Sequence, residues 1–281
     1  MHGTLPILCV MKSGKLMPSS IMHLYQHLSH KIFYTRTNGG LEAMLRICAC
    51  QDKGLRLAVG KALEQVMVSM NRHYIAQHSL FDALTGVACS RESLEAIQCG
   101  TGILENLFKE SAETCLRLIH GGALKALIDA CRSSDPTTLQ HCAAALANCA
   151  MYGEHKCQTA MVANNADHWL FPLAFSKDSI VKYYALLTIC FLAANVDLAN
   201  RVAQSGTLDL VLPFLYTMDP VEFARSCPNH AHGRSAGWLK HLVPLLVSQS
   251  EEARSLAAFH FAMEAAIKKK QQRLHVSVVC M

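Results

Sequence analysis

Amide side chains recur at one position of three successive predicted helices. The quartets ALEQ, ILEN and ALAN end at Gln65, Asn106 and Asn148, and roughly 40 residues separate each from the next, the spacing of stacked helical repeats. Equivalent positions of such repeats form a row along one face. This row could bind a peptide backbone or a polar small ligand on a concave surface, or it could only hold stacked helices together. Both interpretations stay open at this point.

Two groups of side chains have spacings that a metal site could use. His23, His27 and His30 would share one face of a short helix over residues 21–33, where they could bind zinc or copper. The second group lies in a predicted irregular loop and consists of Cys227, His230 and His232. The chain has 15 histidines, so coincidences of this kind are frequent, and we expect no metal site.

Sequence motifs of catalysis are missing. The chain has no phosphate-binding glycine-rich loop at the start of a helix, no G-x-S-x-G turn and no H-E-x-x-H. Its cysteines do not form C-x-x-C pairs with zinc-site spacing. The sequence therefore favours a binding protein without a catalytic cofactor over an enzyme.

The elements that would position these side chains are repeated helices. A short polar turn followed by an apolar helix returns about every 40 residues, which is typical of armadillo and HEAT repeats. The starts lie near Gly39, Ser79, Gly121, Asp167, Ser205 and Gly237. We expect an all-α, armadillo/HEAT-like, right-handed helical solenoid of about five to six repeats. It should occupy residues 38–268, between a divergent N-terminal segment with at most one helix (1–37) and a divergent basic tail (269–281).

Composition limits the remaining functions. Apolar residues make up 51% of the 281 residues and charged residues 17%, which argues against disorder. The net charge of +5 is too small and too scattered for a nucleic-acid interface. No apolar run reaches the roughly 18 residues of a membrane span. The 13 cysteines are irregularly spaced and suit reduced core thiols, so we expect a cytoplasmic protein.

Several strings identify a family. Residues 169–177 (WLFPLAFSK), 205–208 (SGTL), 219–225 (DPVEFAR) and 262–268 (AMEAAIK) closely resemble the armadillo domain of the sterile alpha and TIR motif-containing NAD hydrolases. The quartet ALEQ at residues 62–65 resembles it as well, and so do residues 102–105 (GILE) through Phe108 and Lys109. The resemblance covers about residues 38–268. Neither sterile alpha motif nor TIR sequence follows, so we expect a truncated form.

The resemblance implies a regulatory role. In this family the armadillo domain is an autoinhibitory sensor that restrains the TIR domains, which cleave NAD. The sterile alpha motif domains between them assemble the protein into a ring. NAD bound to the armadillo domain favours the inhibited state, and nicotinamide mononucleotide competes with it. The setting is neuronal axon degeneration and innate immune signalling. The chain itself is not expected to hydrolyse NAD, and a scaffold that binds an extended partner peptide is the alternative function.

The resemblance also implies ligand-binding positions. They are Glu64, Gln65, Arg72, Asn106, Lys109, Phe223, Arg234 and Ser235. Arg72 and Lys109 would bind phosphate, and Glu64 and Gln65 would bind ribose hydroxyls or the amide. The chain departs from the family in three ways. Asn106 replaces a histidine, Ser235 replaces a glycine, and residues 1–37 do not match the upstream repeat that supplies a stacking tryptophan.

Overall fold

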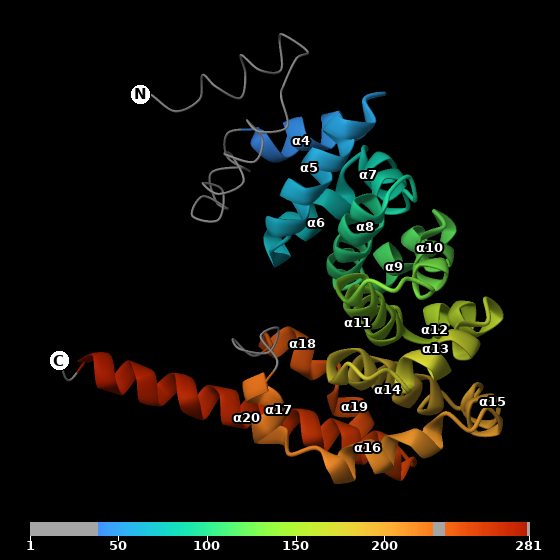
Figure 1. Ribbon diagram of the computed structural model, residues 1–281, viewed down its shortest axis with the longest axis vertical. Coiled ribbons are helices and arrows are strands. Elements are labelled where there is room, and N and C mark those ends of the chain that lie inside the picture. The colour runs from blue at the N-terminus through green and yellow to red at the C-terminus, as the bar shows by residue number, and fades with distance from the viewer. Residues whose placement is uncertain (1–38, 227–233, 280–281) are drawn as a thin grey trace. The chain divides into compact units, whose positions relative to one another are not determined.

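The computed structural model describes residues 39–226 and 234–279, and all regular elements in these ranges are helices (Figure 1). The chain divides into two compact units, residues 1–145 and 146–281, with the boundary inside one helix. The histidines at 23, 27 and 30, the group at 227, 230 and 232, and the segment 1–37 lie outside the described residues, so the expectations about them stay predictions.

The first unit is built from short and long helices in a repeated order. Its helices are α4 (Gly40–Cys48), α5 (Lys53–Gln65), α6 (Ser69–Gln77), α7 (Phe81–Ala88), α8 (Leu94–Leu107), α9 (Ala112–His120), α10 (Ala123–Ala130) and the first part of α11 (Pro136–Tyr152). The side chains of Asp52 and Ser93 accept backbone N–H bonds at the starts of α5 and α8. Asp135 does the same before Pro136, as the sequence of that turn predicts.

The second unit continues the order and ends in one very long helix. It contains the rest of α11, then α12 (Glu154–Ala163), α13 (Ala166–Ala174), α14 (Ser179–Ala193), α15 (Ala199–Gln204), the 3₁₀ turn η1 (Leu208–Leu210), α16 (Val211–Thr217), α17 (Pro220–Ser226), α18 (Ala236–Lys240), α19 (Val243–Leu246) and α20 (Glu251–Val279). α14 is its core, packed against α13, α15 and α20 and buried on nearly every side.

The repeat starts follow the predicted spacing. Helices begin at or within a few residues of every predicted start, at α4, α7, α10, α13, η1 and α18. Gly39, Gly122 and Gly206 precede three of these elements with φ of 71°, 87° and 69°. Asn165 takes the same role before α13 with φ of 55°. This left-handed backbone suits glycine, and asparagine tolerates it better than most other residues. The predicted helical repeat is therefore confirmed.

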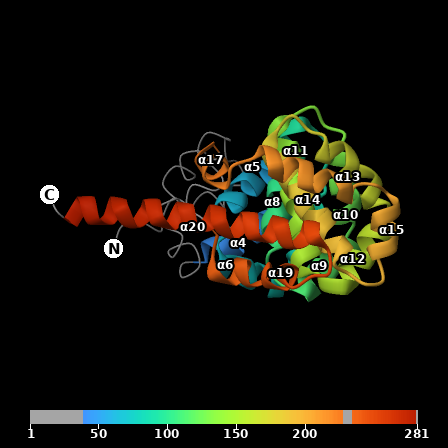
Figure 2. The ribbon, with the colours of Figure 1, turned by 90° about the horizontal axis from the view of Figure 1, so that it is seen from below.

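Two element boundaries differ from the sequence prediction. The apolar run predicts a helix over residues 57–68, but α5 begins at Lys53 behind its Asp52 cap and ends at Gln65. The apolar pattern also predicts a last helix over residues 252–267, whereas α20 runs as one uninterrupted helix to Val279 (Figure 2). Lysine, glutamine and arginine are good helix formers, so α20 continues after its apolar face ends.

The described residues contain neither a helix that could span a membrane nor a cluster that could hold a metal ion. None of their helices combines the length and the apolar character that crossing a membrane needs. Nowhere in the described ranges do three histidine, cysteine or acidic side chains gather as a metal would require. Cys48, Cys142 and Cys190 are buried thiols, and burial raises the pKa of Cys48 to about 12.

Candidate functional site

Glu64 lies directly over the backbone of the neighbouring long helix. It is next to the last residue of α5, which packs against α8. A Cβ atom at Gly102 of α8 would lie 2.1 Å from Oε1 of Glu64 and 3.0 Å from Cε1 of His141. On another side of α8, a Cβ atom at Gly100 would lie 2.2 Å from the carbonyl oxygen of Ala88. Glycine at both positions therefore lets α5 and α7 approach α8 closely.

The carboxylate of Glu64 has an unusual electrostatic environment. Burial raises the pKa of Glu64, and the negative charge of Glu105 raises it further. Positive charge on His141 and Lys61 acts in the opposite direction. Glu64 and Glu105 occupy the same position in the ALEQ and ILEN quartets, so the repeat itself brings two acids together. Such a pair could bind hydroxyl groups of a ligand.

Arg72 is held by a carbonyl and a carboxylate. It lies on α6, and only 15% of its side chain is exposed. Nη1 donates to the carbonyl oxygen of Met67 over 3.1 Å, and Nε lies 3.9 Å from Oε2 of Glu110. The other oxygen of Glu110 lies 2.8 Å from Nδ1 of His73. Arg72 is thus a partly buried cation with an acidic partner.

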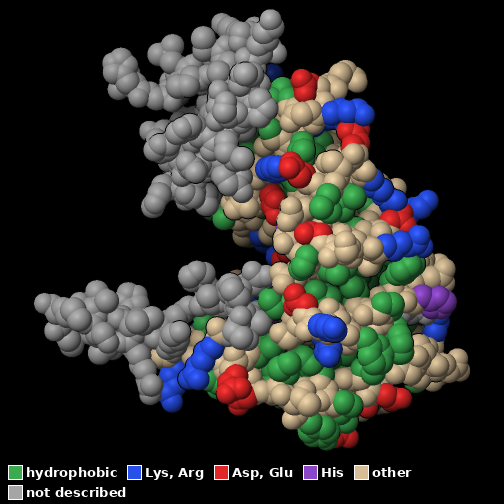
Figure 3. Space-filling view, in the orientation of Figure 1, with side chains coloured by type: hydrophobic (Ala, Val, Ile, Leu, Met, Phe, Trp, Pro, Cys, Tyr) green, Lys and Arg blue, Asp and Glu red, His purple; other side chains and the backbone are tan. Residues whose placement is uncertain are grey.

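Lys109 shows the same arrangement just after α8. Its Nζ donates to Oε1 of Glu105 over 2.9 Å, and only 14% of its side chain is exposed. An anionic ligand would therefore have to compete with glutamates for both predicted phosphate-binding cations. Figure 3 shows acidic and basic side chains close to each other on the visible face of the first unit, in agreement with this mixed charge.

The three amides of the predicted row differ in their surroundings. Gln65 is exposed at the end of α5. Asn106 is half-buried and donates to the carbonyl oxygen of Gly102 over 3.0 Å. Asn148, in the second unit, is buried and accepts a 3.3 Å hydrogen bond from Nε1 of Trp238. Asn148 therefore has the structural role that the sequence left open.

Phe223 lies in the aromatic core of the second unit. It is 2% exposed, and its ring contacts those of Tyr183, Phe214 and Phe259 with centroid separations of 5.3, 6.3 and 5.8 Å. Packing explains this position without a ligand. Its predicted ligand contact stays a prediction, and it would require the core to open.

Arg234 and Ser235 start the segment that leads into α18. The Ser235 hydroxyl accepts from the backbone N–H of Trp238 over 3.2 Å and so caps the helix. The Arg234 guanidinium donates to the Tyr184 hydroxyl and lies over two rings, 5.7 Å from the centroid of Tyr184 and 5.2 Å from that of Trp238. The Arg234 backbone N–H donates to both carboxylate oxygens of Glu264, each over 2.9 Å.

Several residues that contact the predicted ones were not predicted from the sequence. Glu105 could have been found, because it precedes Asn106 just as Glu64 precedes Gln65 in the aligned quartets. Glu110 and Gly102 carry no comparable repeat signal. Glu264 and Tyr184 are far from Arg234 in the sequence and only folding brings them together.

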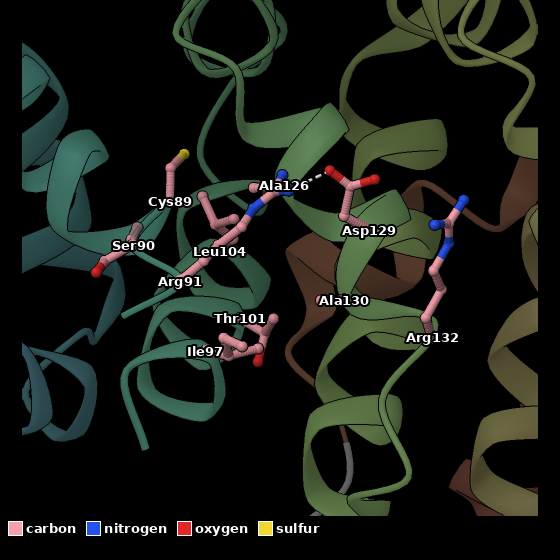
Figure 4. A pocket seen from close by; sticks show the side chains of 11 residues that line it. Cys89, Ser90, Arg91, Ile97, Thr101, Leu104, Ala126, Asp129, Ala130 and Arg132 are labelled. Carbon is pink, nitrogen blue, oxygen red and sulfur yellow. Dashed lines mark ion pairs between the residues drawn. The ribbon is translucent and has the colours of Figure 1, made fainter. Parts of the chain in front are cut away.

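A separate pocket in the first unit lies away from the predicted residues. It has a volume of about 430 Å³ and lies between α7, α8 and α10. Figure 4 shows Arg91 and Asp129 reaching toward each other across it as an ion pair, with Cys89 and Ser90 at one side. None of the predicted ligand residues lines it. Arg91 and Asp129 neutralise each other, Arg132 adds a second cation to the lining, and this combination does not indicate a particular ligand.

Comparison with solved structures identifies the fold. A designed armadillo repeat protein is 19% identical, with a TM-score of 0.58 over 80% of this chain and 99% of its own. A computationally designed armadillo repeat protein is 17% identical, with a TM-score of 0.62 over 87% of this chain and 92% of its own. The chain thus has the all-α armadillo-repeat fold that its sequence predicts.

Comparison with curated proteins identifies relatives. No protein-family model matches the chain. The chain is 47% identical to the NAD(+) hydrolase sarm1 of Drosophila melanogaster over 84% of its length, and 42% identical to the NAD(+) hydrolase SARM1 of Danio rerio over 86%. It is 34% identical to the NAD(+) hydrolase tir-1 of Caenorhabditis elegans over 81%. It spans 17%, 34% and 23% of these relatives' own lengths. The chain therefore belongs to the family of sarm1 and tir-1 proteins, of which it matches an armadillo-repeat part.

Proposed function

We propose that this chain is a regulatory, autoinhibitory armadillo domain that senses NAD and nicotinamide mononucleotide. One observation carries the proposal. In a chain homologous to NAD(+) hydrolases, the partly buried Glu64, Arg72, Glu105 and Lys109 occupy the ends of α5 and α8 and the segments that follow them. Cations and acids held at such positions are the groups that a nucleotide phosphate and ribose require.

Ligand binding at these residues would exchange partners. A phosphate would replace Glu105 at Lys109 and Glu110 at Arg72, and the displaced carboxylates would turn to solvent or to ribose hydroxyls. Arginine offers phosphate a planar pair of donors and lysine a point charge. Both cations are largely shielded from water, which strengthens a charged contact relative to one on an open surface.

The autoinhibitory part of the proposal concerns the rest of the family protein. The relatives are several times longer than the matched segment, and the resemblance supplies sterile alpha motif and TIR domains as partners. The matched part would restrain TIR domains, and no catalytic cofactor is involved. Mononucleotide in place of NAD would weaken the restraint because the two ligands compete for one site.

Isothermal titration calorimetry tests ligand sensing. The purified chain should bind nicotinamide mononucleotide and NAD. Arg72→Ala and Lys109→Ala should each weaken mononucleotide binding about tenfold, the loss expected for one charge-assisted hydrogen bond. Lys53→Ala is the matched control, because Lys53 also pairs with a glutamate but its side chain is 70% exposed and away from these residues. Absence of binding heat at millimolar ligand would contradict the proposal.

A second assay tests autoinhibition. The chain is added to the TIR domain of the zebrafish relative, and NAD cleavage is followed with and without mononucleotide. The chain should lower the cleavage rate, and mononucleotide should restore it. If a saturating concentration of the chain does not change the rate of NAD cleavage, the autoinhibitory role is wrong even if the chain binds nucleotide.

The peptide-binding alternative has less support. It depends on the amide row, but Asn148 is buried and accepts a hydrogen bond from Trp238. An extended peptide could then contact at most Gln65 and Asn106 of the three. A partner protein captured by the chain with an affinity insensitive to Arg72→Ala would favour this alternative.

A further inference from the structure

We propose that one edge of the first unit is a docking surface for an acidic peptide segment of a partner protein. We call this surface the basic edge. It consists of two pockets and the cations that line them, Lys53, Arg56, Arg91 and Arg132. None of the predicted ligand residues lines either pocket, and the inference does not depend on nucleotide binding.

The pocket between α7, α8 and α10 continues across the α7–α8 turn. On the other side of this turn, a second pocket of about 520 Å³ lies between α5, α7 and α8. Ser90 and Arg91 of the turn line both pockets, which therefore form one interrupted groove. Ile97 is partly exposed in the first pocket and Leu57 in the second. Each pocket can thus contact an apolar side chain of a partner.

The helical repeat places the cations along this groove. Each of them lies in or beside a turn that joins a short helix to the next long one: Lys53 and Arg56 in the first turn of α5, Arg91 before α8, and Arg132 before α11. Equivalent turns of stacked repeats form a row along one edge. Four basic and two acidic side chains line the two pockets, so the lining favours an anionic partner.

The two acids hold these cations only weakly. A carboxylate oxygen of Glu92 lies 2.8 Å from Nζ of Lys53 and 4.0 Å from Nη2 of Arg56. Asp129 pairs with Arg91 across the first pocket (Figure 4). Between 31% and 70% of each of these side chains is exposed, and water weakens ion pairs at such positions. Carboxylates of a partner can therefore replace Glu92 and Asp129.

The length of the row favours an extended peptide over a small anion. Neighbouring helices pack about 8–10 Å apart, so three successive turns span about 20 Å. An extended chain covers about 3.3 Å per residue, and about seven residues would follow the row. A peptide can place its acids opposite the cations and its apolar residues at the two pockets. A nucleic acid carries a phosphate at every step and would also meet Glu92 and Asp129.

Fluorescence anisotropy of a labelled acidic peptide tests the basic edge. The probe is DLEDLED, and its matched controls are NLQNLQN, which has no charge, and DSEDSED, which has no apolar side chain. We expect the chain to bind DLEDLED, to bind both controls more weakly, and to lose affinity for the probe as salt is added. Lys53→Ala and Arg91→Ala should each weaken binding of DLEDLED about fivefold, the fold-change of one exposed ion pair. Arg46→Ala should not, because Arg46 also pairs with a glutamate of this unit but lines neither pocket.

Several outcomes would overturn the inference. The basic edge is not a docking surface if the chain leaves the anisotropy of DLEDLED unchanged up to about 1 mM, or if Arg46→Ala weakens binding as much as Arg91→Ala does. Equal binding of DSEDSED would show that the pockets take no part. Tighter binding of a single-stranded oligonucleotide or of anionic lipid vesicles, lost in Arg91→Ala, would assign the surface to one of these instead. Lys53→Ala keeps Arg72 and Lys109, so each of these results leaves the nucleotide proposal to its own test.

Discussion

Nε2 of His260 lies 3.5 Å from Oε1 of Glu264, one turn further along α20. On its other side, Nδ1 of His260 contacts the hydroxyl of Tyr183. A neutral ring with its proton on Nε2 is compatible with both contacts, because Tyr183 then donates to Nδ1 and the N–H edge of the ring lies beside the carboxylate. His260 thus joins the aromatic core to the anchor of Arg234.

The stability of the second unit should fall in mild acid because of His260. Burial lowers the pKa of His260 below its ordinary value, and the nearby carboxylate of Glu264 only partly offsets this. The unfolded chain takes up a proton below about pH 6.5 while the folded chain does not, so the unfolding free energy decreases from there down to the lowered pKa. Urea unfolding monitored by tryptophan fluorescence at about pH 7.5 and about pH 5.5 measures this, because both tryptophans, Trp169 and Trp238, belong to this unit.

The control for this prediction is His260→Gln, which keeps an acceptor for Tyr183 and a donor for Glu264 but does not titrate. Burial also lowers the pKa of His241, so some pH dependence will remain in the variant. Equal pH dependence in both proteins would show that His260 does not cause the effect. At more acid pH Glu264 should contribute too. Burial alone raises its pKa, but bonds from His260 and the Arg234 backbone lower it overall, so this part of the stability is lost below about pH 4.5.

Gly102→Ala should displace Glu64. The added methyl group would lie 2.1 Å from Oε1 of Glu64, with His141 blocking one way out. We expect a loss of about 1–3 kcal/mol of stability and weaker nucleotide binding. Gly86→Ala is the matched control, since Gly86 is also inside a helix but has nothing within 4 Å of its would-be Cβ. It should stabilise the chain by about 0.5–1 kcal/mol. Thermal unfolding and calorimetry of the two variants check this, and equal effects would contradict the proposed close contact.

Alanine substitutions should show which residues of the amide row stabilise the fold. Asn148→Ala removes the acceptor of the buried Trp238 N–H and should cost about 1–3 kcal/mol. Gln65→Ala affects an exposed side chain and should change stability by less than about 0.5 kcal/mol. Urea unfolding of both variants gives the comparison. A larger loss for Gln65→Ala than for Asn148→Ala would refute the structural role of Asn148.

Asn165→Ala should destabilise the start of α13. Asn165 has φ of 55°, a conformation that costs alanine about 1 kcal/mol. Asn165→Gly should be neutral or slightly stabilising, because glycine adopts this backbone freely, as it does at Gly122. Asn164→Ala, next to it but with an ordinary φ of −93°, is the control. If Asn165→Ala and Asn165→Gly unfold at the same temperature, backbone conformation does not determine the residue at this position.

The sequence predicted the repeat well because local chemistry determines it. Glycines at 39, 122 and 206 supply a left-handed backbone before α4, α10 and η1, and Asp52 and Asp135 cap the next long helices, α5 and α11. The ends of helices were harder to predict from the sequence. Val66, Met67 and Val68 extend an apolar pattern beyond α5, although the first two are buried outside any helix. An apolar residue is buried by packing, whether or not its backbone is helical.

The candidate site could be predicted only in part. The resemblance supplied Glu64, Arg72 and Lys109 as candidates, and all three are partly buried ionic residues of one unit. Their contact with a ligand stays a prediction. The pairing of Lys109 with Glu105 is a local contact between residues four apart, which spacing could have predicted. The pairing of Arg72 with Glu110 and the anchoring of Arg234 by Glu264 instead depend on contacts between segments far apart in the sequence. Spacing along the chain carries no signal for such contacts between distant segments. It shows which residues share one face of a helix, but not which helices meet after folding.

Gly100 and Gly102 set different limits on how α8 can shift against its neighbours. A Cβ atom at Gly100 would meet the backbone carbonyl of Ala88 at the end of α7, whereas at Gly102 it would meet the carboxylate of Glu64, the end of a flexible side chain. The seam between α7 and α8 is therefore the less adjustable of the two, because packed backbone cannot move without the helix that carries it. A change of shape in the first unit would be absorbed more easily beside α5, where a side chain can turn, than between α7 and α8.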